Sequence, residues 1–178
     1  MTLALVILGP PGGGKHELAH ALSQRLEVPL VDVGEIMSTM GNGRREGALD
    51  FDNPEQALRD EVRDRIETAA ISHGTVVVEG FPSTMAQLYV LESMLGLRTS
   101  YIVSSCPLHV CVRRIAERKR RTDHPDSVAL RMRTWFGETQ PMLDRLPKLV
   151  LDEPVLGTEG MVARVLKTHE RKLNGARR

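Results

Sequence analysis

The 178-residue sequence has only two cysteines, Cys106 and Cys111, and no hydrophobic run near the roughly 18 residues that a membrane span needs. Two cysteines are too few for a disulfide framework, and a reducing compartment is the default for such a chain. The short apolar run at residues 3–8 has no basic flank, so it does not resemble a signal peptide. We therefore expect no membrane association and a location in the cytoplasm or another reducing intracellular compartment.

Aromatic residues are also scarce, at 3% of the chain, and charges nearly cancel, with 24 Lys and Arg against 23 Asp and Glu. Without a global positive field or many aromatic rings for base stacking, a nucleic acid is an unlikely partner. Hydrophobic residues make up 41% and charged residues 26%, which is enough for a buried core and a polar surface. The length predicts a single domain over residues 1–178.

Hydrophobic runs alternate along the chain with segments of helical spacing. Strands are predicted at residues 3–8, 30–33, 75–78, 99–103 and 148–151. Helices are predicted at residues 16–26, 54–73, 84–95, 107–115, 128–146 (with an irregular apolar phase) and 158–173. Residues 41–53 have little apolar periodicity and are predicted as a surface loop or small insert. This alternation predicts an α/β fold whose five-stranded parallel sheet is flanked by helices on both faces.

The segment Gly9-Pro10-Pro11-Gly12-Gly13-Gly14-Lys15 lies between the first predicted strand and the first predicted helix. It matches the pattern G-x-x-x-x-G-K of a phosphate-binding loop. Glycines let backbone N–H groups turn inward around an anion, and the N-terminus of the following helix adds a positive end. Lys15 adds a mobile full charge for the terminal phosphates. The sequence therefore predicts a nucleotide-phosphate site.

The residues after this lysine depart from the general motif. Ser or Thr usually follows and helps to bind magnesium, but here His16 and Glu17 follow. A carboxylate in the first helical turn suits the helix dipole, yet beside a nucleotide phosphate it would repel. Either Glu17 points away or triphosphate binding is weakened. His16 and His20 have the spacing of a zinc-binding pair, but no third ligand is near in sequence, so no metal site is expected there.

Several motifs, in order over most of the chain, resemble those of the adenylate kinase family of nucleoside monophosphate kinases. The phosphate loop is one of them. Residues 33–37 resemble the start of the acceptor site, and residues 79–84 with Gln87 resemble the D-G-F-P-R-T segment and the glutamine that reads the acceptor base. Residues 114–118 resemble the paired arginines before the lid. Residues 120–123, Arg131 and 138–141 resemble the short lid and its closing helix.

The resemblance implies a P-loop kinase fold that transfers the γ-phosphate of ATP to a nucleoside monophosphate or related acceptor, with ATP and Mg2+ as cofactors. Such a transfer needs positioning and positive charge, and residues 113–133 carry eight Lys or Arg against three Asp or Glu. The implied catalytic residues are Lys15, Arg118, Arg121 and Arg131, with a short lid near 118–126. The implied donor residues are Gly9, Pro10, Gly12, Gly13, Gly14, Lys15, His16, Glu17 and, near the ATP base, Arg114. The implied acceptor residues are Gly34, Glu35, Gly80, Phe81, Ser83 and Gln87, and Glu79 would hold magnesium through water.

The departures from the family gather on the acceptor side. Ser38 and Ser83 stand where two arginines are expected, and serine cannot replace a bidentate arginine–phosphate contact. The acceptor insert is reduced to about residues 38–53, where Arg44 and Arg45 either supply phosphate contacts from new positions or are plain surface residues. Two functions stay open: a phosphotransferase with a nucleotide donor and a nucleotide-like acceptor, or a degenerate family member that acts as a nucleotide-binding or structural module in a protein assembly.

Overall fold

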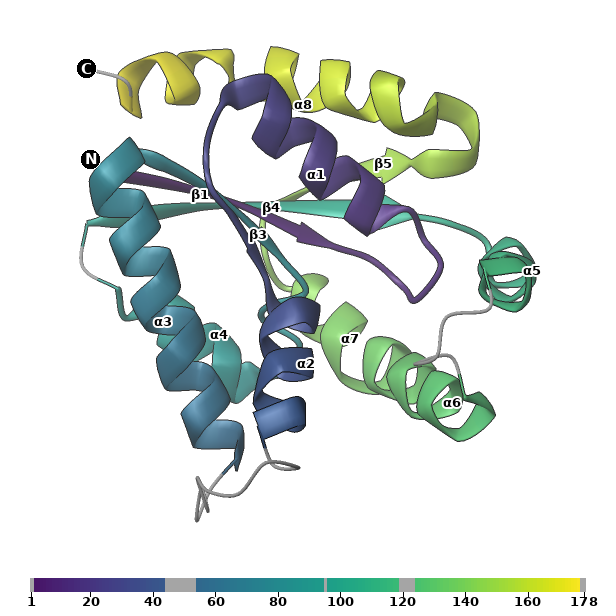
Figure 1. The fold of residues 1–178 in the computed structure, drawn as a ribbon. Coiled ribbons are helices and arrows are strands. Elements are labelled where there is room, and N and C mark those ends of the chain that lie inside the picture. The colour runs from purple at the N-terminus through teal and green to yellow at the C-terminus, as the bar shows by residue number, and fades with distance from the viewer. Residues whose placement is uncertain (1, 44–53, 95, 119–123, 177–178) are drawn as a thin grey trace.

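The computed structural model describes residues 2–43, 54–94, 96–118 and 124–176, and these form an α/β fold around a parallel sheet (Figure 1). The strands are β1 (Thr2–Leu8), β2 (Leu30–Asp32), β3 (Thr75–Glu79), β4 (Leu97–Ser105) and β5 (Lys148–Asp152). Their order in the sheet is β2-β3-β1-β4-β5, and every neighbouring pair is parallel. The predicted five-stranded parallel sheet is confirmed.

Helices cover both faces of this sheet (Figure 1). Helices α1 (Lys15–Leu26) and α8 (Glu153–Ala176) pack on one face. Helices α2 (Val33–Gly43), α3 (Pro54–His73) and α4 (Met85–Glu92) pack on the other. Among the described helices, none is both long enough and apolar enough to cross a lipid bilayer.

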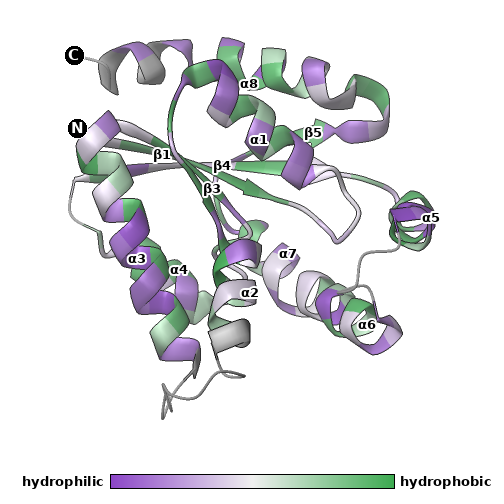
Figure 2. Ribbon diagram, viewed as in Figure 1, coloured by the Kyte–Doolittle hydropathy of each residue, from purple (hydrophilic) through white to green (hydrophobic). Residues whose placement is uncertain are grey.

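Strand β1 runs through the middle of the sheet and supplies both hydrophobic cores. Its residues Leu3, Leu5 and Ile7 belong to the core under α1 and α8, and Ala4, Val6 and Leu8 belong to the core under the other helices. This alternation follows from the two-residue period of a strand. Because both faces are buried, the strand is apolar from Leu3 to Leu8, and the hydropathy colouring of β1 agrees with this (Figure 2).

The predicted helix at 128–146 is instead three consecutive segments: α6 (Pro125–Thr134), the π-helical η1 (Trp135–Thr139) and α7 (Gln140–Leu143). A π-helical turn holds one more residue than an α-helical turn, so it shifts every later side chain around the axis. This shift allows Trp135 and Met142 to enter the same core. The irregular apolar phase of the sequence therefore has a structural cause. Helix α5 (Leu108–Arg118) precedes this region, close to where it was predicted.

Helix α2 was not predicted, and the predicted loop at 41–53 is wrong for residues 41–43, which end this helix. Asp32 stabilises its start, because its Oδ1 accepts a hydrogen bond of 3.2 Å from the backbone N–H of Glu35. Val33 and Ile36 then bury their side chains in the core. Residues 44–53, with Arg44 and Arg45, lie outside the described residues.

The last helix also begins earlier than residue 158. Helical structure starts at Glu153, directly after β5, and is interrupted at Gly157, whose φ of 61° and ψ of 176° are not helical. A positive φ is readily adopted by glycine because it has no Cβ. The interruption leaves a short turn that carries Glu153 at the carboxyl end of the sheet.

Candidate functional site

A cleft of about 990 Å3 opens where the strands β2 and β3 and the loop after β1 end. Ligands of open parallel sheets bind outside the carboxyl ends of the strands, so this is the expected place for a site. Helices α5, α6 and α8 supply its other walls. The residues proposed from the sequence that line the cleft are Gly12, Gly13, Gly14, Lys15, His16, Glu17, Gly34, Glu35, Glu79, Gly80, Arg114, Arg118 and Arg131.

The phosphate loop is shaped by glycines at two close contacts. Gly12 and Gly14 have φ values of 81° and 76°. A Cβ on Gly12 would lie 2.6 Å from the carbonyl oxygen of Cys111, and a Cβ on Gly14 would lie 2.8 Å from the side chain of Glu153. Both the backbone conformation and the packing therefore require glycine at these positions.

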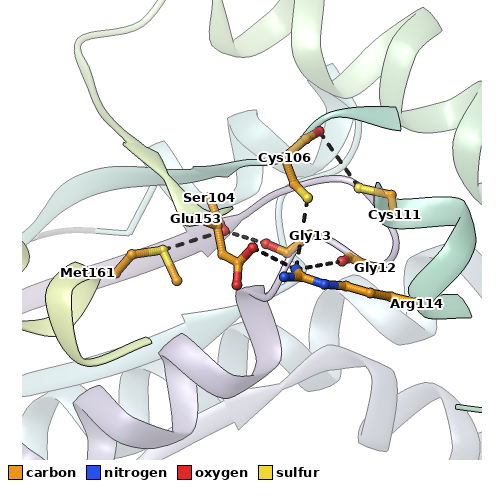
Figure 3. A network of polar contacts seen from close by, with 8 residues as sticks. All are labelled: Gly12, Gly13, Ser104, Cys106, Cys111, Arg114, Glu153 and Met161. Atoms are coloured by element: carbon orange, nitrogen blue, oxygen red, sulfur yellow. Dashed lines mark hydrogen bonds and ion pairs between the residues drawn. The ribbon is translucent and has the colours of Figure 1, made fainter. Parts of the chain in front are cut away.

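Gly9 and Pro10 are not among the described residues that line the cleft. They instead hold the loop through contacts with Gly13 and with β4. The carbonyl of Pro10 accepts a hydrogen bond of 2.9 Å from the N–H of Gly13, which closes the turn. A Cβ on Gly9 would lie 2.7 Å from the carbonyl oxygen of Ser104, so the loop packs directly on β4. The hydroxyl of Ser104 donates to the carbonyl of Gly13 (Figure 3). The loop is thus anchored at both its start and its middle.

Lys15 is half-buried at the first turn of α1, with its Nζ 3.5 Å from the carbonyl oxygen of Pro10. Burial lowers the pKa of Lys15, the negative charge of Glu79 opposes this, and the positive charges of Arg118 and Arg131 lower the pKa further. Three cationic side chains from α1, α5 and α6 therefore act on one another across the cleft. An anion placed among them would relieve their repulsion, as a phosphate-binding site requires.

Two carboxylates meet His16 next to the phosphate loop. The His16 Nδ1 lies 2.9 Å from the Oε2 of Glu79 and 3.5 Å from the Oδ2 of Asp32. Glu79 ends β3, Asp32 ends β2, and the two residues are paired in the register of the sheet. Sequence reasoning singled out Glu79 and missed Asp32. The signal that could have found it is a carboxylate at the end of a second apolar strand.

Arg114 is bonded to Glu153, which like Asp32 was missed in the sequence. Its Nη1 lies 2.6 Å from the Oε2 of Glu153 and 3.5 Å from the carbonyl oxygen of Gly12 (Figure 3). The hydrogen bond to Glu153 raises the pKa of Arg114 above its ordinary value. The pair joins α5 to the start of α8 across the phosphate loop. No motif marks Glu153 in the sequence, because its place next to Arg114 depends on the pairing of β5 with β4.

The predicted acceptor residues divide into two groups. Gly34, Glu35 and Gly80 line the cleft, whereas Phe81, Ser83 and Gln87 are not among its described lining residues. Phe81 is fully buried in the core. The Oε1 of Gln87 accepts hydrogen bonds from the backbone N–H of Ser83 at 2.8 Å and from its hydroxyl at 3.0 Å. In this structure the amide of Gln87 therefore holds the loop before α4, and its reading of an acceptor base stays a prediction.

Part of the predicted lid cannot be described. Arg121 and its neighbours at 119–123 lie outside the described residues, as do Arg44 and Arg45. Arg118 ends α5 and Arg131 lies within α6, so these two residues flank that segment in the chain. Both line the cleft.

The sequence is similar to known proteins over most of its length. A family described as an AAA domain matches residues 8–129. The chain is 31% identical to an adenylate kinase of Nocardia farcinica over 84% of this chain and 88% of that protein. It is 30% identical to an adenylate kinase of Mycolicibacterium paratuberculosis over 80% of this chain and 84% of that protein. It is 29% identical to an adenylate kinase of Corynebacterium urealyticum over 90% of this chain and 93% of that protein.

Proposed function

This chain belongs to the adenylate kinase family, a family of nucleotide-kinase-type phosphotransferases, and from that premise we propose that it transfers the γ-phosphate of ATP to a nucleoside monophosphate or a related acceptor. The observation that carries the proposal is the convergence of Lys15, Arg118 and Arg131 on a glycine-shaped loop at one cleft. The whole of residues 1–178 acts as one domain, with a reduced acceptor insert at about 38–53 and a short lid at about 118–126.

Phosphoryl transfer needs little covalent help from a protein, but it needs the reacting groups to be held in line and their charge to be neutralised. Lys15 and the backbone N–H groups of the loop would hold the donor phosphates. Arg118, Arg131 and Arg121 would neutralise charge on the moving group. Closure of the lid over the cleft would exclude water and suppress hydrolysis of the donor.

The residues that we place around the ATP phosphates include a carboxylate that fits Mg2+, an ion that prefers oxygen ligands. The carboxylate of Glu79 lies beside the phosphate loop, with its Oε2 2.9 Å from the Nδ1 of His16. Glu79 would hold the ion through water, and the ion would supply positive charge to the phosphate oxygens. Arg114 lies against the loop at Gly12, on the side where we place the donor base.

The acceptor is proposed more broadly, because the two family arginines are replaced by Ser38 and Ser83. Gly34, Glu35 and Gly80 line the cleft beside Ser38 and would contact the acceptor. Arg44 and Arg45 would supply its phosphate contacts. Because these departures concern the contacts to the acceptor phosphate, the proposal includes acceptors related to nucleoside monophosphates as well as nucleoside monophosphates themselves.

A test of the donor site is calorimetric titration of the protein with magnesium-ATP. We expect binding by the wild-type chain and at least about tenfold weaker binding by Lys15→Ala, since a charge-assisted hydrogen bond contributes roughly 1.5–3 kcal/mol. Lys167→Ala, on the exposed part of α8, is the matched control and should bind as the wild type does. Equal affinity in Lys15→Ala and the wild type would show that the loop does not bind the nucleotide. Phosphorylated acceptors would then be sought by chromatography after incubation with candidate monophosphates.

A second function, a catalytically degenerate module, is favoured by Glu17. This exposed residue lines the cleft, and its negative charge acts on Lys15. A carboxylate at this place opposes a triphosphate. Wild-type protein that fails to bind magnesium-ATP, together with a Glu17→Thr variant that binds it, would support the degenerate module over the kinase.

A further inference from the structure

Two histidines of α1 and the aspartate that ends β2 come together beside the phosphate loop. His16, His20 and Asp32 each offer one ligand atom, and these three atoms all lie within 4.8 Å of one another. We propose that these side chains form a binding site for a divalent transition-metal ion, with Zn2+ as the representative ion. The sequence argued against such a site because no third ligand lies near the two histidines in the chain and because His16 sits in the phosphate loop. The fold supplies that ligand from β2.

Helix α1 presents the two imidazoles together. Residues four apart lie one turn apart on the same face of a helix. The ring centroids of His16 and His20 are 4.3 Å apart, with an angle of 62° between the ring planes. The buried side of α1 includes Leu18, Ala19 and Leu22, and neither histidine is part of the hydrophobic core. His20 is exposed and His16 is half-buried at the cleft.

Asp32 is held in place before any ion binds. Its Oδ1 accepts the backbone N–H of Glu35 at 3.2 Å, while its Oδ2 faces the Nδ1 of His16 at 3.5 Å. Glu79 lies 2.9 Å from the same Nδ1 and is itself buried. A ligating histidine commonly bonds to a carboxylate through its second ring nitrogen, so we assign to Glu79 the role of holding the ring at Nδ1, which leaves Nε2 of His16 to bind the ion.

Two imidazoles and a carboxylate are the donor set of many zinc sites that keep one coordination position open. Nitrogen ligands favour transition-metal ions, whereas Mg2+ favours oxygen ligands alone. Ligand atoms about 2.1 Å from a common ion lie roughly 3.4 Å apart in a tetrahedral shell, so small rotations of the side chains, above all of the exposed His20, complete the geometry. The open position faces the cleft, because His16 and Asp32 line it. Water or a phosphate oxygen of the nucleotide would occupy this open position. Only the binding of a nucleotide phosphate there rests on the proposed function.

The test uses the full chain, treated with a chelator and then titrated with zinc chloride in the absence of nucleotide. We expect one ion to bind per chain, and binding at least about tenfold weaker in His20→Gln, which loses a ligand. His73→Gln, an exposed histidine at the end of α3, is the matched control and should bind as the wild type does. Visible absorption of bound Co2+ gives a second readout, and its spectrum should change in His20→Gln.

Equal zinc affinity in the wild type and His20→Gln would overturn the proposal, as would an equal loss in His73→Gln. Displacement of zinc by equimolar Mg2+ would also overturn it, since it would indicate an oxygen-only site. Asp32→Asn should weaken binding too, but Asp32 also caps α2, so the exposed His20 carries the test. The Lys15→Ala variant separates this site from the ATP site, because it should still bind zinc when it no longer binds ATP. If the wild-type protein does not bind ATP at all, it should still bind zinc.

Discussion

At the scale of single residues, the sign of charge around Lys15 decides what the cleft can bind. Arg118 and Arg131 act on Lys15 as like charges, and Glu79 and Glu17 act on it as opposite charges. Glu79 is buried, and its Oε2 lies 2.9 Å from the Nδ1 of His16. Glu17 is exposed at the first turn of α1 and lines the cleft. We propose that its negative charge limits the affinity for an anion.

Replacement of this carboxylate should therefore tighten phosphate binding. We expect Glu17→Thr to bind magnesium-ATP roughly fivefold more tightly than the wild type, because two like charges in a partly hydrated site interact by about 1 kcal/mol or more. Calorimetric titration measures the change. Glu55→Thr, in the exposed first turn of α3, controls for the loss of a helix-dipole contact. Unchanged or weaker binding by Glu17→Thr would mean that this carboxylate points away from the phosphates when the nucleotide is bound.

At the scale of elements, the loop is held between helices that are far apart in the chain. The bond between Arg114 and Glu153 links α5 to the start of α8, and Gly14 of the loop packs against the side chain of Glu153. Helix α8 also packs along α1 in the core under one face of the sheet. A change in the start of α8 is therefore transmitted to the phosphate loop by direct contact.

The stability of this link can be measured. We expect Glu153→Gln to lower the free energy of unfolding by about 1–2 kcal/mol, since it leaves the guanidinium of Arg114 without its charged partner. The Arg114 side chain is 35% exposed, so solvent screens the lost interaction and keeps the loss below that of a fully buried pair. Urea unfolding measures the loss, with the exposed Glu159→Gln of α8 as the control.

A double variant isolates the pair itself. In Arg114→Met with Glu153→Gln, the loss should be smaller than the sum of the two single losses, because the second substitution has no ion pair left to break. Strict additivity would contradict a direct link between the two elements.

At the scale of the whole molecule, stability should depend on keeping two acidic groups neutral inside the fold. Burial raises the pKa of Tyr101, in β4, to about 12, and burial raises the pKa of the Cys111 thiol in α5. In both cases the folded state holds its proton more tightly than the unfolded chain does. The stability that they contribute is fully present below the unfolded pKa values, near 9 and 10, and is lost as the pH rises toward 12.

We therefore expect the free energy of unfolding to fall by a few kcal/mol between pH 8 and pH 11, as measured by urea unfolding. Tyr101→Phe should make this dependence less steep, since phenylalanine has no proton to lose, while the contribution of Cys111 remains. Tyr89→Phe is the matched control, because Tyr89 is 65% exposed, and it should keep the wild-type pH profile. A wild-type profile that stays level over this range would refute the assignment.

The sequence alone determined the parts of this protein that depend on local order. The run at 3–8 is apolar at every position because β1 is covered on both faces, so the sheet could be predicted. The glycines before Lys15 let the backbone N–H groups turn toward an anion, so the phosphate loop could be predicted as well. The resemblance to adenylate kinases rests on motifs of the same local kind, and the comparisons confirm the family. The roles of the individual site residues remain predictions.

Only the tertiary structure decided which side chains meet. Helix α2 is stabilised by burial of Val33 and Ile36, which composition does not reveal. Asp32 reaches His16 because β2 pairs with β3 in a register that sets Asp32 beside Glu79. Glu153 reaches Arg114 because it directly follows β5, whose last residue is paired with the end of β4 in the sheet. Each of these contacts joins residues at least 16 positions apart, and distances of that kind are set by the packing of the sheet and its helices, not by neighbours in the sequence.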